Sequence, residues 1–269
     1  MVALRIFSYL PNPRIMKATI TARLCDIKVE IRGAKPKELV KWLWDFEAHE
    51  LTDDDRLRLD VVANQSHTGF DDTLYKTAAF LASHPFGTVP AAFSPSGETG
   101  IFESNSILRA VARVGINKYN LYGEDPYESS RIDSFLDVSL VFARQSQIYL
   151  IALSQNKCNQ KIHAETASAL DNFLTGMNYA LSINANGLVN NQLSIADICF
   201  VCEMCQLSRE RAHIKKLNQL GFELIYNRKT LNKKYKQAMQ HFDNLCNHSA
   251  FSPDIEPLMK KLSEIENAV

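Results

Sequence analysis

The sequence has no hydrophobic run near the roughly 20 residues that a membrane-spanning helix needs. The segment from Met1 to Tyr9 is too short for the apolar core of a signal peptide, and Pro11 and Pro13 interrupt its continuation. Positive and negative residues balance, with 30 Lys and Arg against 30 Asp and Glu, so no net charge attracts nucleic acid or a membrane surface. We therefore expect a cytoplasmic protein without a membrane partner.

Several chemical signatures are also missing. The sequence contains no glycine-rich phosphate loop and no His-Glu-x-x-His metal motif. The six cysteines lack the density of a secreted disulfide scaffold, which indicates a reducing compartment. The spacing Cys199-x-x-Cys202-x-x-Cys205 is metal-like, but it lies in an apolar helical segment without a fourth cysteine nearby. We interpret these cysteines as a small-residue core face and predict no metal site.

Basic residues cluster only between Arg209 and Lys236, where few acidic residues accompany them. Such a cluster is usually the solvated face of a helix, although it is also the pattern of a surface that binds an anionic polymer. With a neutral chain around it, the cluster does not make nucleic acid an expected partner.

The first 31 residues predict a β-α-β unit. Leu4–Tyr9 is rich in strand formers, and Pro11-Asn12-Pro13 ends that strand. Apolar residues recur at helical spacing from Arg14 to Cys25, and Pro13 suits the first turn of this helix. Residues 27–31 then alternate apolar and polar, as in a strand.

Residues 91–93 and 100–102 predict two short strands around a Pro95-Ser96-Gly97-Glu98 turn, and residues 104–114 predict a helix. Together with the opening unit they form the β-α-β…β-β-α layout of a thioredoxin-like domain, which we place at residues 1–114. Residues 39–73 separate its halves. Because a structureless loop of that length is unusual inside a domain, we interpret them as a mostly helical insertion.

Residues 115–126 contain Gly123 and Pro126 and predict a linker. The patterns beyond it are long and helical, over 131–153, 162–181 and 194–207, with no strand alternation. The predicted fold is therefore α+β, a thioredoxin-like N-terminal domain followed by an all-α domain at residues 127–269.

Two short motifs lie where such a domain would hold a small peptide. Val89-Pro90 precedes the strand at 91–93, and Glu103-Ser104 stands at the start of the helix at 104–114. An acid and a hydroxyl beside a helix N-terminus suit an amine and a carboxylate of a ligand. Each motif also has a purely structural interpretation, because Val-Pro occurs in many turns and Glu-Ser can simply cap a helix.

These features together resemble the cytosolic glutathione transferase superfamily over nearly the whole chain, apart from the segment around residues 39–73. Within it, the stretch from Tyr9 to Ala18 is most similar to the transferase-like domain of the gamma subunit of elongation factor 1. Asn12 is also placed as in the fungal transferases related to the yeast nitrogen regulator. Ser194-Ile195-Ala196-Asp197 matches the capping motif of the family's helical domain, which implies a structural role for Ser194 and Asp197.

The resemblance implies glutathione as co-substrate. Val89 and Pro90, a step that is usually cis in the family, would bind the cysteinyl part, while Glu103 and Ser104 would bind the γ-glutamyl end. The catalytic residue that ionises the thiol follows the first strand in the family. Here that loop offers Asn12, which would also contact glutathione, and behind it Tyr9 and Ser8.

Two functions remain open at this point. The first is an enzyme that conjugates the glutathione thiolate to a small electrophile, as a homodimer by resemblance. The second is a non-catalytic interaction module of the elongation factor 1 gamma type, with a protein partner. The two binding motifs favour the enzyme, whereas the lack of a clear activating residue and the long insertion favour the module. Fold alone does not decide between them.

Overall fold

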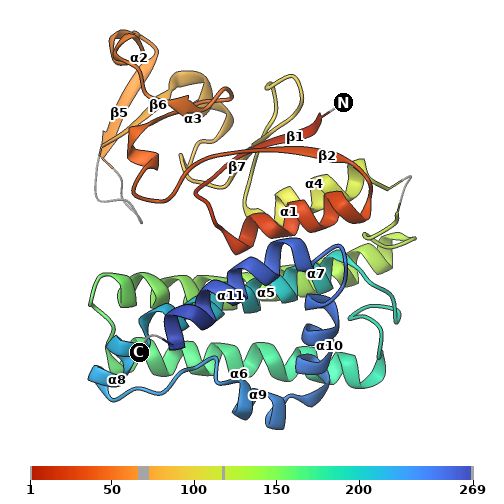
Figure 1. The fold of residues 1–269 in the computed structure, drawn as a ribbon. Helices are drawn as coiled ribbons and strands as arrows, with labels where there is room; N and C mark the ends of the chain where they lie inside the picture. Colours follow the sequence, from red (N-terminus) through yellow and green to blue (C-terminus); the bar gives the residue numbers. More distant parts are fainter. Residues whose placement is uncertain (1, 66–72, 117–118, 268–269) are drawn as a thin grey trace. The chain divides into compact units, whose positions relative to one another are not determined.

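The computed structural model describes residues 2–65, 73–116 and 119–267. The chain divides into two compact units, residues 1–118 and 119–269, and this boundary falls within the segment 115–126 that was predicted as a linker (Figure 1). The first unit combines strands and helices, and the second is helical. The predicted fold class is confirmed.

The main sheet of the first unit has the order β2-β1-β7-β8. Its strands are β1 (Val2–Phe7), β2 (Lys28–Arg32), β7 (Ala91–Phe93) and β8 (Gly100–Phe102). β1 pairs with β2 in parallel and with β7 antiparallel, and β7 pairs antiparallel with β8. The predicted β-α-β…β-β-α layout is therefore present.

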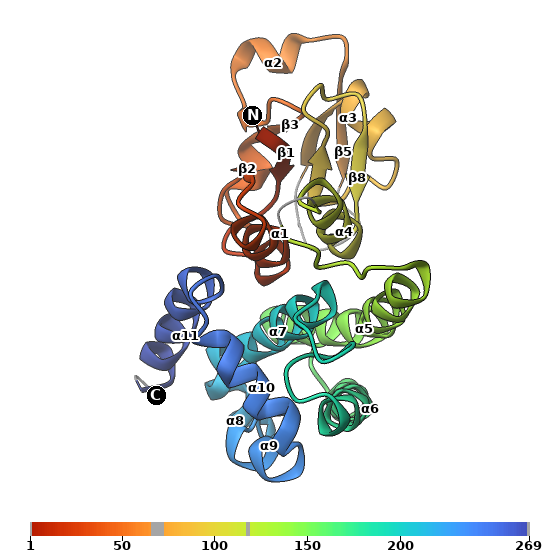
Figure 2. The ribbon, with the colours of Figure 1, turned by 90° about the vertical axis from the view of Figure 1, so that its right-hand side faces the viewer.

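Two helices, α1 (Pro13–Leu24) and α4 (Ser104–Val114), lie side by side against one face of this sheet (Figure 2). The apolar spacing of α1 turns Ile15, Ala18 and Ala22 into one core with Leu4 and Ile6 of β1. Successive side chains of a strand point to opposite faces, so Ala92 of β7 joins this core, whereas its neighbours face the other way.

The predicted helical insertion is wrong. Residues 39–77, termed the insert, form a second four-stranded sheet of order β4-β3-β6-β5, with residues 66–72 outside the described part of the chain. Its elements, with the helix after them, are η1 (Leu39–Lys41), β3 (Trp42–Trp44), β4 (His49–Glu50), α2 (Asp53–Leu57), β5 (Val61–Gln65), β6 (Thr73–Thr77) and α3 (Ala78–Ser83). Strands of two to five residues are too short to show alternation in the sequence, and β3 pairs in parallel with the distant β6.

The insert covers the sheet face opposite α1 and α4, as Figures 1 and 2 show. Phe7 and Phe93 point to this face and form a second core with Trp44 of the insert and Phe80 of α3. The rings of Phe7 and Trp44 meet edge to face at 5.5 Å between centroids. The insert thus shares a hydrophobic core with the main sheet and packs against Phe7 of β1 and Phe93 of β7.

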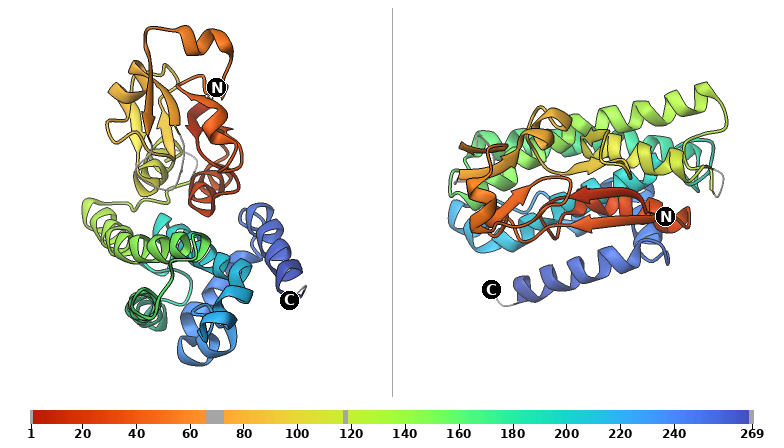
Figure 3. Two further views of the ribbon diagram at one scale, coloured as in Figure 1. Left: turned by 90° about the vertical axis from the view of Figure 1, so that its left-hand side faces the viewer. Right: turned by 90° about the horizontal axis from the view of Figure 1, so that it is seen from above.

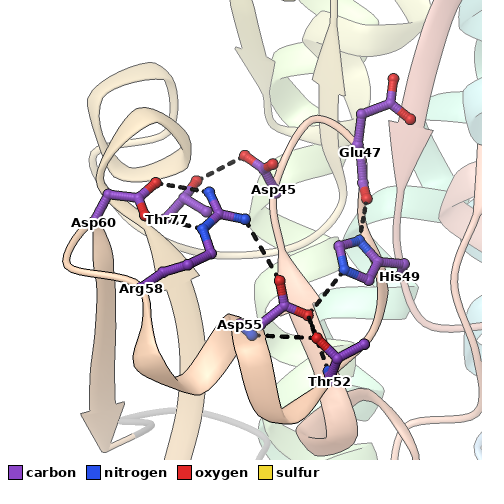
Figure 4. Close-up of polar contacts among 8 residues, drawn as sticks. All are labelled: Asp45, Glu47, His49, Thr52, Asp55, Arg58, Asp60 and Thr77. Atoms are coloured by element: carbon purple, nitrogen blue, oxygen red, sulfur yellow. Dashed lines mark hydrogen bonds and ion pairs between the residues drawn. The ribbon is translucent and has the colours of Figure 1, made fainter.

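A polar network fixes α2 to β4 (Figure 4). Thr52 and Asp55 form a reciprocal capping box at the start of α2. Nε2 of His49 lies 3.1 Å from Oδ2 of Asp55, and Nδ1 of His49 lies 2.6 Å from the carbonyl oxygen of Glu47. The hydrogen bonds from Thr52 lower the pKa of Asp55 to about 2, so this carboxylate stays charged and anchors the turn.

The second unit is built around α7 (Ile195–Ser208), all of whose residues are buried. Its other elements are α5 (Pro126–Ser154), α6 (Gln160–Ile183), η2 (Arg209–His213), α8 (Ile214–Leu220), α9 (Arg228–Lys234), α10 (Lys236–Cys246) and α11 (Ser252–Asn267). The long helices α5 and α6 run side by side (Figure 3). Cys199, Cys202 and Cys205 are at most 1% exposed and belong to the core of this unit.

Asp197 connects three parts of the helical unit. It accepts hydrogen bonds from the backbone nitrogen of Leu188 at 2.9 Å and from the backbone and hydroxyl of Ser194 at 2.9 and 2.8 Å. Nε2 of His241, on α10, lies 2.8 Å from Oδ1 of Asp197. The side chain is fully buried, so every lost contact leaves an unpaired polar group.

We expect Asp197→Asn to lower the free energy of unfolding of the helical unit by about 2 kcal/mol, because the amide loses one acceptor oxygen and the charge beside His241. Urea denaturation followed by far-ultraviolet circular dichroism measures the change. Glu165→Gln, at an exposed carboxylate on α6, is the matched control. Equal unfolding midpoints for Asp197→Asn and the control would contradict the structural role.

No helix among the described residues is long and apolar enough to cross a membrane.

Candidate functional site

The strand register brings three distant segments to one edge of the main sheet. Phe7 of β1 pairs with Ala91 of β7, and Ala91 pairs in turn with Phe102 of β8. The residues next to these positions toward the same edge are Ser8, Pro90 and Glu103. The loop after β1, the Val89-Pro90 step and the start of α4 therefore lie next to one another.

The loop after β1 is tied together by Asn12. Its Oδ1 accepts a hydrogen bond from the backbone nitrogen of Arg14 at 3.0 Å, which caps α1. Its Nδ2 donates to Oγ of Ser8 at 3.1 Å. The peptide bond between Leu10 and Pro11 is cis. Asn12 thus holds the loop against the end of β1 and keeps one further amide N–H on the same nitrogen.

The three candidate activators of a thiol differ in exposure. Ser8 is fully buried and Asn12 is 3% exposed, whereas Tyr9 is half-buried. The ring of Tyr9 packs against the second core, and no hydrogen bond to its hydroxyl comes from the part of the chain that the structure describes. Ser8 and Asn12 are thus both enclosed, and Tyr9 is the most accessible of the three candidates.

The Val89-Pro90 peptide bond is cis. Val89 is half-buried and packs against the core formed by Trp44 and Phe7. The chain reaches it through Gly87, whose φ of +57° is one that glycine adopts without cost. The side chain of Val89 thus packs against a core to which the insert contributes Trp44.

Glu103 does not cap the helix that begins after it. Its side chain makes no capping hydrogen bond and is exposed, and its backbone has φ 68° and ψ 126°. A non-glycine residue at such angles costs of order 1 to 3 kcal/mol, and such residues gather at functional sites. The purely structural interpretation of Glu103-Ser104 as a cap does not account for this carboxylate.

Beside it lies a residue that the sequence did not single out. Nζ of Lys17, in the middle of α1, donates to Oγ of Ser104 at 3.2 Å and to Oδ1 of Asn105 at 2.7 Å. Lys17 and Asn105 are each 1% exposed and Ser104 is 8% exposed. A lysine between apolar residues of a buried helix face was the available signal, but only the packing of α1 on α4 shows its target.

This edge of the sheet therefore offers complementary charges a few residues apart. The start of α4 presents backbone N–H groups and the Ser104 hydroxyl, which suit a carboxylate, and the buried Lys17 ammonium lies behind them. The exposed Glu103 carboxylate suits an amine. A ligand with both groups on one carbon atom, an amino acid terminus, matches the pair.

No protein-family model matches the chain, and no curated protein matches it. Solved structures do. A glutathione transferase-like protein from Lodderomyces elongisporus is 17% identical with a TM-score of 0.65, over 95% of this chain and 96% of that one. The glutathione transferase URE2P5 from Phanerochaete chrysosporium is 14% identical with a TM-score of 0.64, over 98% of both chains.

The chain has the glutathione transferase fold. A further transferase of this fold, from Methylobacillus flagellatus, has glutathione bound and is 11% identical with a TM-score of 0.60, over 94% of this chain and 98% of that one. The glutathione transferase fold accounts for the thioredoxin-like unit and the helical unit together. Among the described residues, no group of three His, Cys, Asp or Glu side chains could hold a metal ion.

Proposed function

We propose that this protein binds glutathione and conjugates its thiolate to a small electrophile. The observation that carries the proposal is the pair of complementary groups at the start of α4, an exposed Glu103 carboxylate beside the Ser104 hydroxyl, with Lys17 behind it. This pair stands next to a cis Val89-Pro90 step on the same sheet edge. The likeness to transferases, one of them with glutathione bound, supports the same ligand.

In this proposal each end of glutathione has its own partner. The Glu103 carboxylate pairs with the γ-glutamyl amine. The γ-glutamyl carboxylate takes the Ser104 hydroxyl and the first backbone N–H groups of α4, with the Lys17 ammonium behind them. The backbone of Val89 pairs with the cysteinyl residue, which directs the thiol toward the loop that holds Tyr9 and Asn12.

The thiol must give up its proton to solvent water before it reacts, and a free cysteine thiol has a pKa of about 8.5. A hydrogen bond from the remaining N–H of Asn12, together with the positive end of α1, would stabilise the thiolate. The thiolate then attacks the electrophilic carbon, a carbon–sulfur bond forms, and the leaving group departs with its electron pair. The Tyr9 hydroxyl is the alternative donor.

Glu103 joins a strained backbone to a binding carboxylate, so its substitution affects stability and binding differently. We expect Glu103→Ala and Glu103→Gly each to weaken glutathione binding at least tenfold, because both remove the carboxylate. Glu103→Gly should nevertheless be more stable than Glu103→Ala by about 1 kcal/mol, because glycine accepts φ 68°.

Calorimetry with glutathione and urea denaturation measure these two effects, with Ser104→Ala as a second binding variant. Glu98→Ala removes an exposed carboxylate from the neighbouring turn and serves as the matched control. Absence of binding by the wild type would contradict the proposed function. Wild-type affinity in both Glu103 variants would contradict only the assignment of the carboxylate.

The alternative is a non-catalytic interaction module of the elongation factor 1 gamma type. The burial of Ser8 and Asn12 favours it, because neither side chain is open to solvent. An activated aryl chloride with glutathione separates the two functions. Turnover that falls in Asn12→Ala or Tyr9→Phe supports the enzyme, whereas glutathione binding without turnover supports the module and a protein partner.

The resemblance also carries three finer proposals, namely a homodimer, a cytoplasmic location and an electrophile of small size. Light scattering of the purified protein tests the first of these, since a dimer doubles the mass of the 30.4 kDa chain.

A further inference from the structure

The insert contains a buried lysine, Lys76, whose ammonium group contacts a loop outside the insert. Lys76 of β6 is 7% exposed, and its Nζ donates to the carbonyl oxygen of Gly87 at 2.7 Å. The same Nζ lies 4.8 Å from the centroid of the Trp44 ring. A cation over a tryptophan face gains electrostatic attraction, so the two contacts together hold the ammonium in one place.

The position of Lys76 results from the pairing of the second sheet. β6 lies between β3 and β5, and Lys76 pairs with Trp44 on one side and with Val62 on the other. These neighbours are apolar, and burial lowers the pKa of Lys76. No ion pair joins Lys76 to a carboxylate within the described residues. Burying an ammonium group costs free energy unless its N–H groups donate hydrogen bonds. The hydrogen bond to the carbonyl oxygen of Gly87 therefore offsets part of the cost of burying Lys76.

The partner carbonyl belongs to the loop that leads into the candidate site. The nitrogen of Gly87 donates to the carbonyl oxygen of His84 at 2.8 Å, which closes a turn. A Cβ atom at Gly87 would lie 2.9 Å from Nζ of Lys76, so the loop passes close to the lysine head group, and φ +57° favours glycine at this position. Val89 comes two residues later, with its side chain against the same core as Trp44.

We propose that Lys76 is a positioning residue for the glutathione site and that the insert serves as a brace for residues 87–90. This inference rests on the proposed function. Lys76 fixes the carbonyl of Gly87, the core that contains Trp44 packs against the side chain of Val89, and the backbone of Val89 is then presented to the cysteinyl part of glutathione in one conformation. The second sheet thereby gains a role in ligand binding without any contact with the ligand.

The test compares Lys76→Met, Lys76→Arg and the control Lys41→Met, which removes an exposed lysine from the same insert. Calorimetry measures glutathione affinity, and steady-state kinetics with an activated aryl chloride separate the two substrates. We expect Lys76→Met to raise the Kd and KM for glutathione about tenfold, with the KM for the electrophile and kcat at saturating glutathione unchanged. Lys76→Arg keeps a donor and a cation, so it should recover most of the affinity.

The outcomes distinguish a failure of the proposed function from a failure of the role assigned to Lys76. A wild type that binds no glutathione would contradict the proposed function and this inference together. Binding by the wild type, with a folded Lys76→Met of equal affinity, would overturn the inference alone. If Lys76→Met does not fold, Lys76→Gln replaces it, because a shorter neutral amide no longer reaches Gly87. Affinity within twofold of the wild type in that variant would also overturn the inference.

Discussion

Replacing Lys17 with methionine is expected to weaken glutathione binding about 100-fold. Lys17 is 1% exposed, and its ammonium donates to Ser104 and Asn105 at the start of α4, where the γ-glutamyl carboxylate would bind. With the γ-glutamyl carboxylate bound at Ser104 as proposed, loss of the ammonium leaves that charge without its cation, and truncating one partner of such a pair costs about 2 to 5 kcal/mol of binding free energy. Methionine keeps the length and packing of the side chain, so the loss reports on charge and hydrogen bonding.

A modified ligand distinguishes this role from a general loss of structure. Calorimetry would compare glutathione with an analogue whose γ-glutamyl carboxylate is an amide. The wild type should prefer glutathione strongly, and Lys17→Met should bind the two ligands almost equally. Lys28→Met, at an exposed lysine of β2, is the control. A Lys17→Met protein that still discriminates between the ligands as the wild type does would show that Lys17 does not act on the carboxylate.

The sequence predicted those elements whose pattern is local. The helix α1 has a complete apolar stripe after an Asn-Pro start, and the helices of the second unit run for several turns. The prediction for the insert was wrong, because its structure is not local. Its strands of two to five residues show no period, and β3, besides pairing with the nearby β4, pairs with β6, some thirty residues later. Non-local pairing of that kind leaves almost no trace in a single sequence.

The residues of the candidate site also fall into those that the sequence predicted and those that it did not. Val89, Pro90, Glu103 and Ser104 were identified from their order along the chain and from resemblance, and the register from Phe7 through Ala91 to Phe102 explains why they meet. The two buried lysines were not identified. Lys17 and Lys76 are typical surface residues by composition, and only the packing of α1 on α4 and of β6 behind residues 87–90 buries them.

The backbone angles of Glu103 were equally beyond the sequence. Nothing in Phe102-Glu103-Ser104 predicts a positive φ, because the usual sequence signal for such a conformation is a glycine. The glutamate stands at these angles although its exposed side chain does not cap the helix. Strained residues of this kind are found where local rules and function conflict, which is why local rules miss them.

Acidification is expected to destabilise the first unit through His84. This histidine is 1% exposed, and its ring stacks on Phe80 and meets Phe93 edge to face at 4.7 Å between centroids. Burial lowers the pKa of His84 to about 4, against an ordinary value near 6.5. The unfolded chain therefore takes up the proton first as the pH falls.

The sign of the effect is set by proton uptake. Between pH 6.5 and pH 4 the unfolded state holds the extra proton and the folded state does not, so stability decreases as the pH falls through this window. Below pH 4 both states are protonated and the loss is complete, at about 3 kcal/mol. His49 acts in the opposite sense, because its hydrogen bond to the Glu47 carbonyl raises its pKa, and its contribution is lost as the pH rises.

Urea denaturation at pH 7.5 and pH 4.5 tests this, followed by tryptophan fluorescence, which reports on the first unit alone because both tryptophans, Trp42 and Trp44, belong to it. We expect His84→Phe, which preserves the aromatic stack, to abolish most of the decrease in stability between the two pH values. The control His49→Gln should instead make the decrease larger. If His84→Phe and the wild type lose stability equally on acidification, the buried neutral imidazole is not the source, and carboxylates of the first unit must carry the effect.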